Sequence, residues 1–365
     1  MTDSQNKTLK AKKSEGYIAS IWRRMKRNKR AMLGLTFVVF MLIVALLSPL
    51  IANNKPILCK YKGQLYAPGI VEVFQSRGYG HHWIKKSEPF NQPSFDIREA
   101  LKQDKIDNPD DSWALWPVIP YGELEINEDV AWPCPPSKVH LMGCDGMGRD
   151  LAARMVHGTS VAAQVGFISM GIAALIGIIV GGAAGYWGGW VDIAICRIIE
   201  IVMCFPVFFL ILTIMVWLEP SINNVMIVLG LTRWTGIARY TRAEFIRHRN
   251  SDYVLAARSL GIGHIRIMFR HILPNSLAPV MVTLTFGIAG AIMTEAGLSY
   301  LGFGVQPPSP SWGNILRMAA DPDYVRNAPY LMVPPCVCIF LAVLSYNLVG
   351  DALRDAIDPR LRNAG

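Results

Sequence analysis

The chain has 365 residues, of which 52% are hydrophobic and only 17% charged, and its formal net charge is +9. About one quarter of the residues of a typical soluble domain are charged. The composition therefore excludes a disordered chain, a coiled coil, a disulfide-stapled secreted module and a purely cytosolic globular protein.

Basic residues gather beside the first apolar block. Residues 1–30 carry ten Lys or Arg against two acidic residues, and Ala31–Ile51 follows as an uninterrupted apolar run. Such a run is long enough to cross the ~30 Å hydrocarbon core, and flanking positive charge favours the cytoplasmic side. We expect a basic cytoplasmic N-terminus over 1–30 and a first transmembrane helix over 31–52. This charge pattern indicates membrane topology, so no nucleic-acid partner is predicted.

Residues 53–157 form a polar stretch that contains four of the ten Trp residues of the chain. Its aromatic content favours a small folded extracytoplasmic insertion over a linker, although its strands cannot be assigned. Three cysteines lie in it: Cys59, Cys134 and Cys144. One disulfide could form among them, but the spacing does not fix the pairing. The adjacent His81 and His82 are interpreted as surface residues, and no metal site or cofactor is predicted.

Five further apolar spans are predicted: Val161–Tyr186, Ile193–Leu218, Val225–Tyr240, Leu277–Phe303 and Tyr330–Leu348. The first of these is rich in Gly, and small residues let transmembrane helices approach closely. Because successive spans alternate in direction, loop 241–276 and the tail 353–365 should share the cytoplasmic side with the N-terminus. We therefore predict an all-α polytopic membrane protein with six transmembrane helices, five of them in a core over 158–352.

The loop between the fourth and fifth predicted spans has the pattern of two short helices joined by a turn. Asp252 can cap a helix that starts at Tyr253, Gly261 or Gly263 can end it, and Pro274 should stop the second helix. Four apolar residues of the second helix fall on one face: Ile265, Met268, Phe269 and Ile272. The pattern fits an interfacial amphipathic helix or a docking element for a cytosolic protein.

This loop resembles the "EAA" coupling loop of ABC importer permeases, whose pattern is E-A-A, three residues, Gly, nine residues, I-x-L-P. Leu255-Ala256-Ala257 takes the E-A-A place, with Leu255 instead of Glu, and His271 stands at the Ile position. The surrounding residues are similar to the peptide and nickel branch of the family. The resemblance implies that these residues couple the protein to ATPase subunits: Tyr253, Ala256, Ala257, Gly261, His271, Leu273 and Pro274.

A second stretch, before the second predicted span, resembles the G-T-D-x-x-G-R-D sequence of C-type oligopeptide permeases. The matching residues are Gly143, Asp145, Gly148, Arg149 and Asp150, and Cys144 replaces the usual Thr. Segments 295–313 and 351–360 are similar to the same branch. The insertion resembles the longer extracytoplasmic region of permeases that import microcin C and related peptides.

The resemblance implies a type I ABC importer permease in a bacterial inner membrane, with oligopeptides as substrates. It also implies the partners: a second homologous permease, two ATP-binding subunits, an extracytoplasmic solute-binding protein and the lipid bilayer. The chain has no G-x4-G-K-[ST] motif, so it is not expected to be an enzyme and ATP hydrolysis would belong to the partner subunits. Nickel or another small solute remains an alternative, and a secondary transporter would need an internal repeat that the sequence does not show.

Charged residues fall inside three of the predicted spans, and Arg233 lies in the short span Val225–Tyr240. An ionisable residue in a membrane span is a functional hypothesis by default, so Glu295 is a candidate for the transport pathway. Arg197 and Glu200 are spaced i, i+3, which predicts a structural ion pair.

Overall fold

The structure is a computed structural model and describes residues 17–75, 90, 96–108, 112–219 and 221–357. Most of the expected basic N-terminus, residues 1–16, lies outside the described part. So do His81, His82 and the tail from residue 358 onward.

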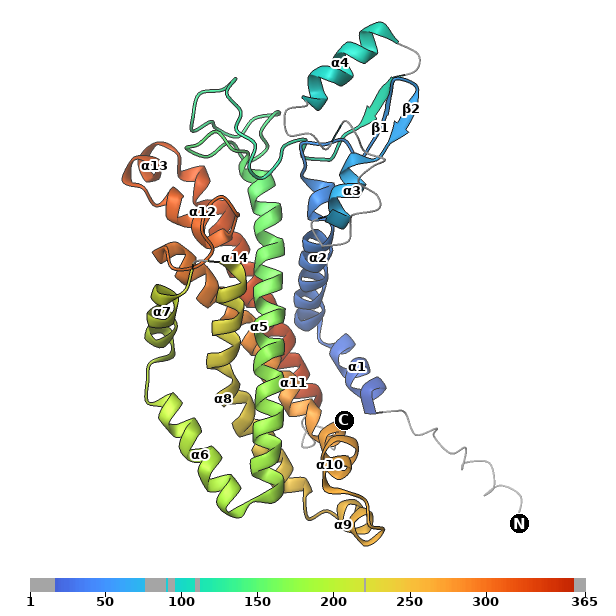
Figure 1. Cartoon of the computed structure of the whole chain (residues 1–365), viewed down its shortest axis with the longest axis vertical. Coiled ribbons are helices and arrows are strands. Elements are labelled where there is room, and N and C mark those ends of the chain that lie inside the picture. The colour runs from blue at the N-terminus through green and yellow to red at the C-terminus, as the bar shows by residue number, and fades with distance from the viewer. Residues whose placement is uncertain (1–16, 76–89, 91–95, 109–111, 220, 358–365) are drawn as a thin grey trace, which may run out of the picture.

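Long helices form one elongated bundle (Figure 1). They are α1 (Tyr17–Arg27), α2 (Lys29–Ile51), α5 (Leu151–Trp187), α6 (Gly189–Met203), α7 (Val207–Trp217), α8 (Ile222–His248), α11 (Leu273–Leu301) and α14 (Val333–Ile357). Shorter elements join them: α9 (Asp252–Ser259), α10 (His264–Arg266), a π-helix (Ile267–Ile272), α12 (Trp312–Ala319), α13 (Pro322–Asn327) and a 3₁₀ turn (Pro329–Leu331). The bundle is therefore mostly helical, as predicted.

The two ends of the bundle carry different parts of the chain. α1, α9, α10 and the last turn of α14 lie at one end, which we call the inner end (Figure 1). The insertion, α12 and α13 lie at the opposite end, which we call the outer end. At the inner end an Arg24 guanidinium donates to the Ala356 carbonyl at 3.4 Å, so the beginning and end of the described chain meet there.

Glycines of α5 allow α8 to pack directly against its backbone. A Cβ atom at Gly181 would lie 2.2 Å from the Ala238 carbonyl oxygen, and one at Gly185 would lie 2.6 Å from that of Arg242. Only a hydrogen fits in this space, which is the use of small residues expected for this Gly-rich span.

The count of six transmembrane helices is only partly matched. Among the described residues, four helical segments are long and apolar enough to cross a membrane: Lys29–Ile51, Leu151–Trp187, His264–Leu301 and Pro329–Ile357. A fifth exists if α6 and α7, which are bent by 79°, count as one span. The bend lies at Pro206, which has no N–H to continue the helix, so the span expected over Ile193–Leu218 is divided into two helices. α8 falls short because Asn and Arg residues interrupt its apolar residues.

Two predicted boundaries also differ. α5 begins at Leu151, ahead of the expected Val161, because the Asp150 carboxylate accepts from the Ala153 N–H at 2.7 Å and caps it. The last residues assigned to the insertion are therefore the first two turns of this helix.

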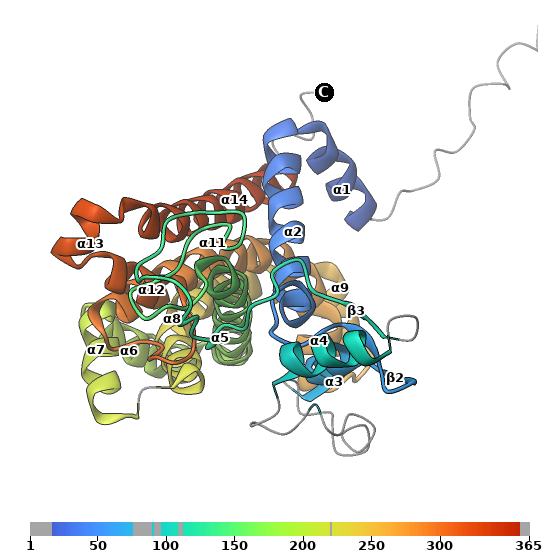
Figure 2. The same ribbon diagram turned by 90° about the horizontal axis from the view of Figure 1, so that it is seen from above.

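The insertion contains strands as well as helices. β1 (Leu58–Tyr61) pairs antiparallel with β2 (Gln64–Tyr66) and with β3 (Trp113–Leu115), in the order β2-β1-β3. Helices α3 (Pro68–Gln75) and α4 (Ile97–Asp107) accompany this sheet beside the outer end of α2 (Figure 2). A small core of Cys59, Phe90, Ile97 and Leu101 holds the sheet and α4 together.

Two of the three cysteines of the insertion form a disulfide, and the third is free. Cys134 and Cys144 form a disulfide with a Cα–Cα distance of 4.8 Å. Cys59 is free, with none of its surface exposed, and burial raises the pKa of its thiol to about 11. Neither Cys59 nor the disulfide pair offers an accessible thiolate.

An impermeant maleimide applied to intact cells should therefore not label the native cysteines of the insertion. It should label a Lys138→Cys variant, since Lys138 is exposed at the outer end. An Asn250→Cys variant at the inner end should react only after the cells are opened. Labelling of Asn250→Cys in intact cells would contradict the topology expected from the charge distribution.

Candidate functional site

The segment from α9 to α11 forms a compact unit at the inner end. α9 ends in a Schellman turn, in which the Ile262 N–H donates to the Ala257 carbonyl at 3.1 Å and the Gly261 N–H to that of Arg258 at 2.9 Å. Gly261 has φ +74°, whereas Gly263 is extended with φ −63°. The prediction of a turn at Gly261 is thus confirmed.

Two details of the predicted helix pair are wrong. α9 already includes Asp252; its N-cap residue is Ser251, and no side chain caps it. Pro274 does not stop the second helix but lies in the first turn of α11, where its missing N–H costs little. The π-helix leads directly into α11, so His264–Leu301 is one continuous helical segment.

One side of this unit packs on the bundle. Buried side chains of the unit contact Tyr186 and Phe245 of α5 and α8: Val254, Ala257, Ile267, Met268 and Ile272. Of the four residues expected on one apolar face, Met268 and Ile272 are buried, whereas Ile265 and Phe269 are exposed. The wider π-helical turn shifts the side chains relative to a regular α-helix, which brings Ile267 into the core instead.

Tyr186, at the end of α5, anchors the unit. Its hydroxyl lies 2.8 Å from His264 Nδ1, and the Arg258 guanidinium lies 5.1 Å from the centre of its ring. Both α9 and α10 are therefore tied to one tyrosine, by a hydrogen bond and a cation–π contact. No sequence pattern indicates this role, because Tyr186 is 78 residues away from His264.

Four large apolar side chains of the unit are exposed. We call them the docking face: Leu255 (47% exposed), Leu260 (80%), Ile265 (68%) and Phe269 (46%). Three exposed arginines accompany it: Arg258, Arg266 and Arg270. Large exposed apolar side chains clustered at the end of a bundle indicate a surface that another molecule covers.

The expected coupling residues divide between these two sides. Ala256 is exposed, whereas Ala257 is 4% exposed and packs in the core. Tyr253 is partly exposed, and its hydroxyl lies 3.1 Å from His248 Nδ1; burial raises the pKa of Tyr253. Three residues line the start of α11: the His271 carbonyl accepts from the Asn275 amide at 2.7 Å, Leu273 packs on the core, and Pro274 is exposed.

The two alanines should therefore respond differently to enlargement. Ala257→Leu would overpack the contact of α9 with α5, at a cost of about 1–3 kcal/mol, and should displace α9. Ala256→Leu leaves that core intact and should change only what binds outside. Limited proteolysis of the purified protein should show faster cleavage near α9 for Ala257→Leu, with Ala256→Leu as the matched control. Equal cleavage of both variants would contradict this assignment.

At the outer end, the Gly143–Asp150 motif forms the entry to α5. Asp145 has none of its surface exposed; its carboxylate accepts from the Arg149 Nε at 2.9 Å and the Met147 N–H at 2.8 Å. Arg154 approaches the same carboxylate with its Nε at 3.5 Å. One buried carboxylate thus holds two guanidinium groups.

The rest of the motif fixes the chain around this carboxylate. Gly143 and Gly148 have φ of +84° and +76°, a region that favours glycine. Asp150 is 2% exposed and also lies 2.8 Å from His140 Nδ1. The motif and the coupling loop lie at opposite ends of the bundle, so they belong to separate sites (Figure 1).

Glu295, the candidate pathway residue, is 1% exposed in this conformation. Its carboxylate accepts from the Ser299 hydroxyl at 2.6 Å inside the protein, and its place in the transport pathway stays a prediction. Arg197 and Glu200 do form the predicted ion pair, at 2.6 Å and on the exposed side of α6.

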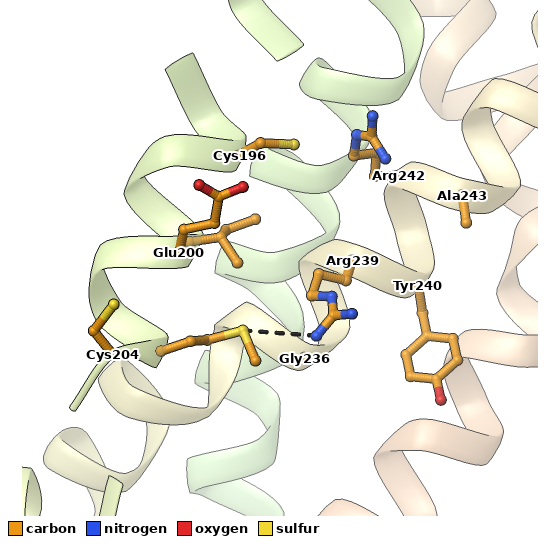
Figure 3. A pocket seen from close by; sticks show the side chains of 10 residues that line it. Cys196, Glu200, Cys204, Gly236, Arg239, Tyr240, Arg242 and Ala243 are labelled. Atoms are coloured by element: carbon orange, nitrogen blue, oxygen red, sulfur yellow. Dashed lines mark hydrogen bonds between the residues drawn. The ribbon is translucent and has the colours of Figure 1, made fainter. Parts of the chain in front are cut away.

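A cleft of about 890 Å³ opens between α6 and α8 (Figure 3). Arg239 reaches across it towards Met203 Sδ at 3.7 Å, and Arg242 forms a bidentate pair with Asp192 at 2.5 and 2.7 Å. The other polar side chains that line it are Cys196, Glu200, Cys204 and Tyr240. Arg239 was not singled out from the sequence, although an ionisable residue in a span is the signal that would have found it.

Two family models match the chain, and its fold is similar to that of a solved transporter subunit. The family model described as the inner membrane component of binding-protein-dependent transport systems matches residues 173–363. The N-terminal transmembrane domain of oligopeptide transport permease C matches residues 16–68. A chain of the inward-facing MetNI methionine ABC transporter is 18% identical, with a TM-score of 0.47, and covers 57% of this chain and 98% of its own.

Relatives match over different lengths. The peptidoglycan transport system permease protein YejE of Agrobacterium fabrum is 32% identical over 93% of this chain and 92% of its own length. The inner membrane ABC transporter permease protein YejE of Escherichia coli is 30% identical over 93% and 96%. The dipeptide transport system permease protein DppC of Alkalihalophilus pseudofirmus is 39% identical over 62% and 74%. A family model matches more than half of the chain, two relatives match nearly all of it, and its long helices are apolar. The chain therefore belongs to the multi-pass inner membrane permeases of binding-protein-dependent ABC transport systems.

Proposed function

We propose that the chain is the membrane-spanning subunit of an ATP-driven importer that carries oligopeptides across a bacterial inner membrane. The observation that carries the proposal is the docking face, an exposed apolar surface held rigidly at one end of a transport-family bundle. Peptide is the proposed substrate class because relatives that match along the chain are named for peptidoglycan or dipeptide transport. The Agrobacterium relative, which matches 93% of this chain, is named for peptidoglycan transport, so peptidoglycan-derived peptides are the first substrates to test, ahead of microcin C-like peptides.

The family works with ATP-binding subunits and other components. We assign two ATP-binding subunits to the docking faces of this chain and of a second homologous permease, and a solute-binding protein to the outer end. α9 is tied to α10 by Tyr186, and α10 continues through the π-helix into α11. A subunit that moves α9 on binding ATP would therefore move α11 as well, and the ATP-driven motion would reach the transport path directly.

The same proposal fixes the topology. The inner end lies in the cytoplasm, and α6–α7 and α8 complete six membrane crossings. Arginines close to the inner end of α8 agree with this orientation. α8 would then place its arginines against neighbouring helices, where Arg233 already donates to the Gly290 carbonyl at 2.9 Å.

The proposal is tested by uptake in a strain that lacks its own peptide importers. The chain is expressed with its partner subunits, and uptake of a labelled peptidoglycan tripeptide is compared with uptake of labelled alanyl dipeptide and of ⁶³Ni²⁺. We expect ATP-dependent peptide uptake that is lost when the phosphate-binding Lys of the ATP-binding subunits is replaced. Uptake of Ni²⁺ without peptide uptake would assign the alternative substrate, and uptake that persists without the ATP-binding subunits would refute the ABC assignment.

A further inference from the structure

A second cavity, of about 380 Å³, lies at the outer end between the start of α5, the end of α11, α12 and α13. Three arginines line it: Arg149, Arg154 and Arg317. Among the residues that line it, Asp321 is the sole carboxylate. The cavity is therefore strongly cationic.

Arg154 is buried, and within the described part of the chain it has no close hydrogen-bond acceptor at its Nε. Its side chain is 1% exposed, yet its Nε has no hydrogen-bond partner among the described residues. Its nearest carboxylate oxygen, on Asp145, is 3.5 Å away, and its Nη1 reaches the Glu123 carbonyl only at 3.5 Å. A buried guanidinium needs a close counter-charge and several hydrogen-bond acceptors.

The carboxylates near Arg154 already have other partners. Asp145 accepts the closer bond from Arg149, Asp150 lies against His140, and the Glu123 carboxylate pairs with His157 at 3.1 Å. Asp321 caps α13 by accepting from the Asp323 N–H at 2.9 Å. Glu295 lies behind Ser299 and does not line the cavity.

Arg317 adds a third positive charge with space around it. It packs against Gly302, where a Cβ atom would lie 2.3 Å from its Nη1, and no carboxylate of the described residues lies within 4.0 Å of its nitrogens. Arg149 Nη2 meets only the Met318 sulfur, at 3.9 Å. Each of the three guanidinium groups thus retains N–H donors that no strong acceptor of the described chain fills.

We propose that this cavity binds a small oxyanion, a carboxylate or a phosphate. Guanidinium forks match both groups with paired hydrogen bonds, and the ion would balance the positive charge that remains because Arg149 and Arg154 share the single carboxylate of Asp145. The oxyanion has two possible sources: a free ion that stabilises the outer end, or the C-terminal carboxylate of an imported peptide. The second source rests on the proposed function, whereas the first does not.

The test measures the unfolding temperature of the purified full-length chain with its partner permease, at constant ionic strength. Acetate and phosphate should raise it by ~2 °C or more relative to chloride, increasing with the logarithm of anion concentration. Trialanine and trialanine amide distinguish the sources. If trialanine raises the unfolding temperature at far lower concentration than acetate does, and trialanine amide does not raise it, the cavity binds the peptide terminus. If acetate and trialanine have equal effects, the cavity binds a free ion.

Variants locate the effect in the cavity. Arg154→Gln should abolish the shift, and Arg197→Gln, in the exposed ion pair of α6, should keep it. Met318→Glu places a carboxylate beside Arg149 and should give a stable protein that no longer responds to anions. If no anion raises the unfolding temperature of the wild type, or if Met318→Glu responds like the wild type, the proposal is overturned.

Discussion

Replacing Gly261 by valine is expected to weaken capture of the ATP-binding subunits by about 5- to 150-fold and to reduce transport with it. Gly261 has φ +74°, and a β-branched residue held there carries about 1–3 kcal/mol of strain, which corresponds to that range of affinities. No atom lies within 4 Å of the added Cβ, so the effect is conformational and not a steric clash. The variant can relieve this strain by changing the backbone conformation of the α9–α10 turn. Binding of an ATP-binding subunit would then have to restore the original conformation, which lowers the affinity.

Gly263 provides the matched control. It lies two residues further along the same exposed turn and also has open space around it, but its φ is −63°, which valine adopts without strain. Gly263→Val should therefore retain the ATP-binding subunits on co-purification. Both variants should remain in the membrane and bind the partner permease. Equal recovery of ATP-binding subunits with Gly261→Val and wild type, together with unchanged uptake, would remove the assignment of this loop to coupling.

Replacing Asp145 by alanine is expected to destabilise the outer end by about 3–5 kcal/mol, because two guanidinium groups would lose their shared buried carboxylate. The midpoint of thermal unfolding should fall by about 4–7 °C, because the entropy of unfolding grows with chain length. Fluorescence-detected size-exclusion chromatography of heated, detergent-solubilised protein measures this midpoint. Glu200→Gln is the control: it removes the exposed partner of Arg197, which contributes about 0–1 kcal/mol. If the two variants melt alike, Asp145 does not organise the entry to α5.

Local signals in the sequence were enough to locate most helices and the coupling turn. Long apolar runs have no other stable conformation in a membrane than the helix, so the regions of α2, α5, α11 and α14 were predictable. The turn at Gly261 was also predictable, because only glycine adopts a left-handed conformation at low cost. The spacing of the Gly143–Asp150 motif indicated a site but not what its residues contact.

The tertiary structure decided the features that depend on residues far apart in the chain. Which alanine of α9 is buried depends on how the π-helix shifts the following side chains against Tyr186 and Phe245. The cationic cavity forms because α12 and α13 lie against the start of α5 and the residues that precede it. A sequence pattern reports periodicity and local backbone preference, whereas the walls of this cavity come from segments more than 150 residues apart in the chain, such as those that carry Arg149 and Met318.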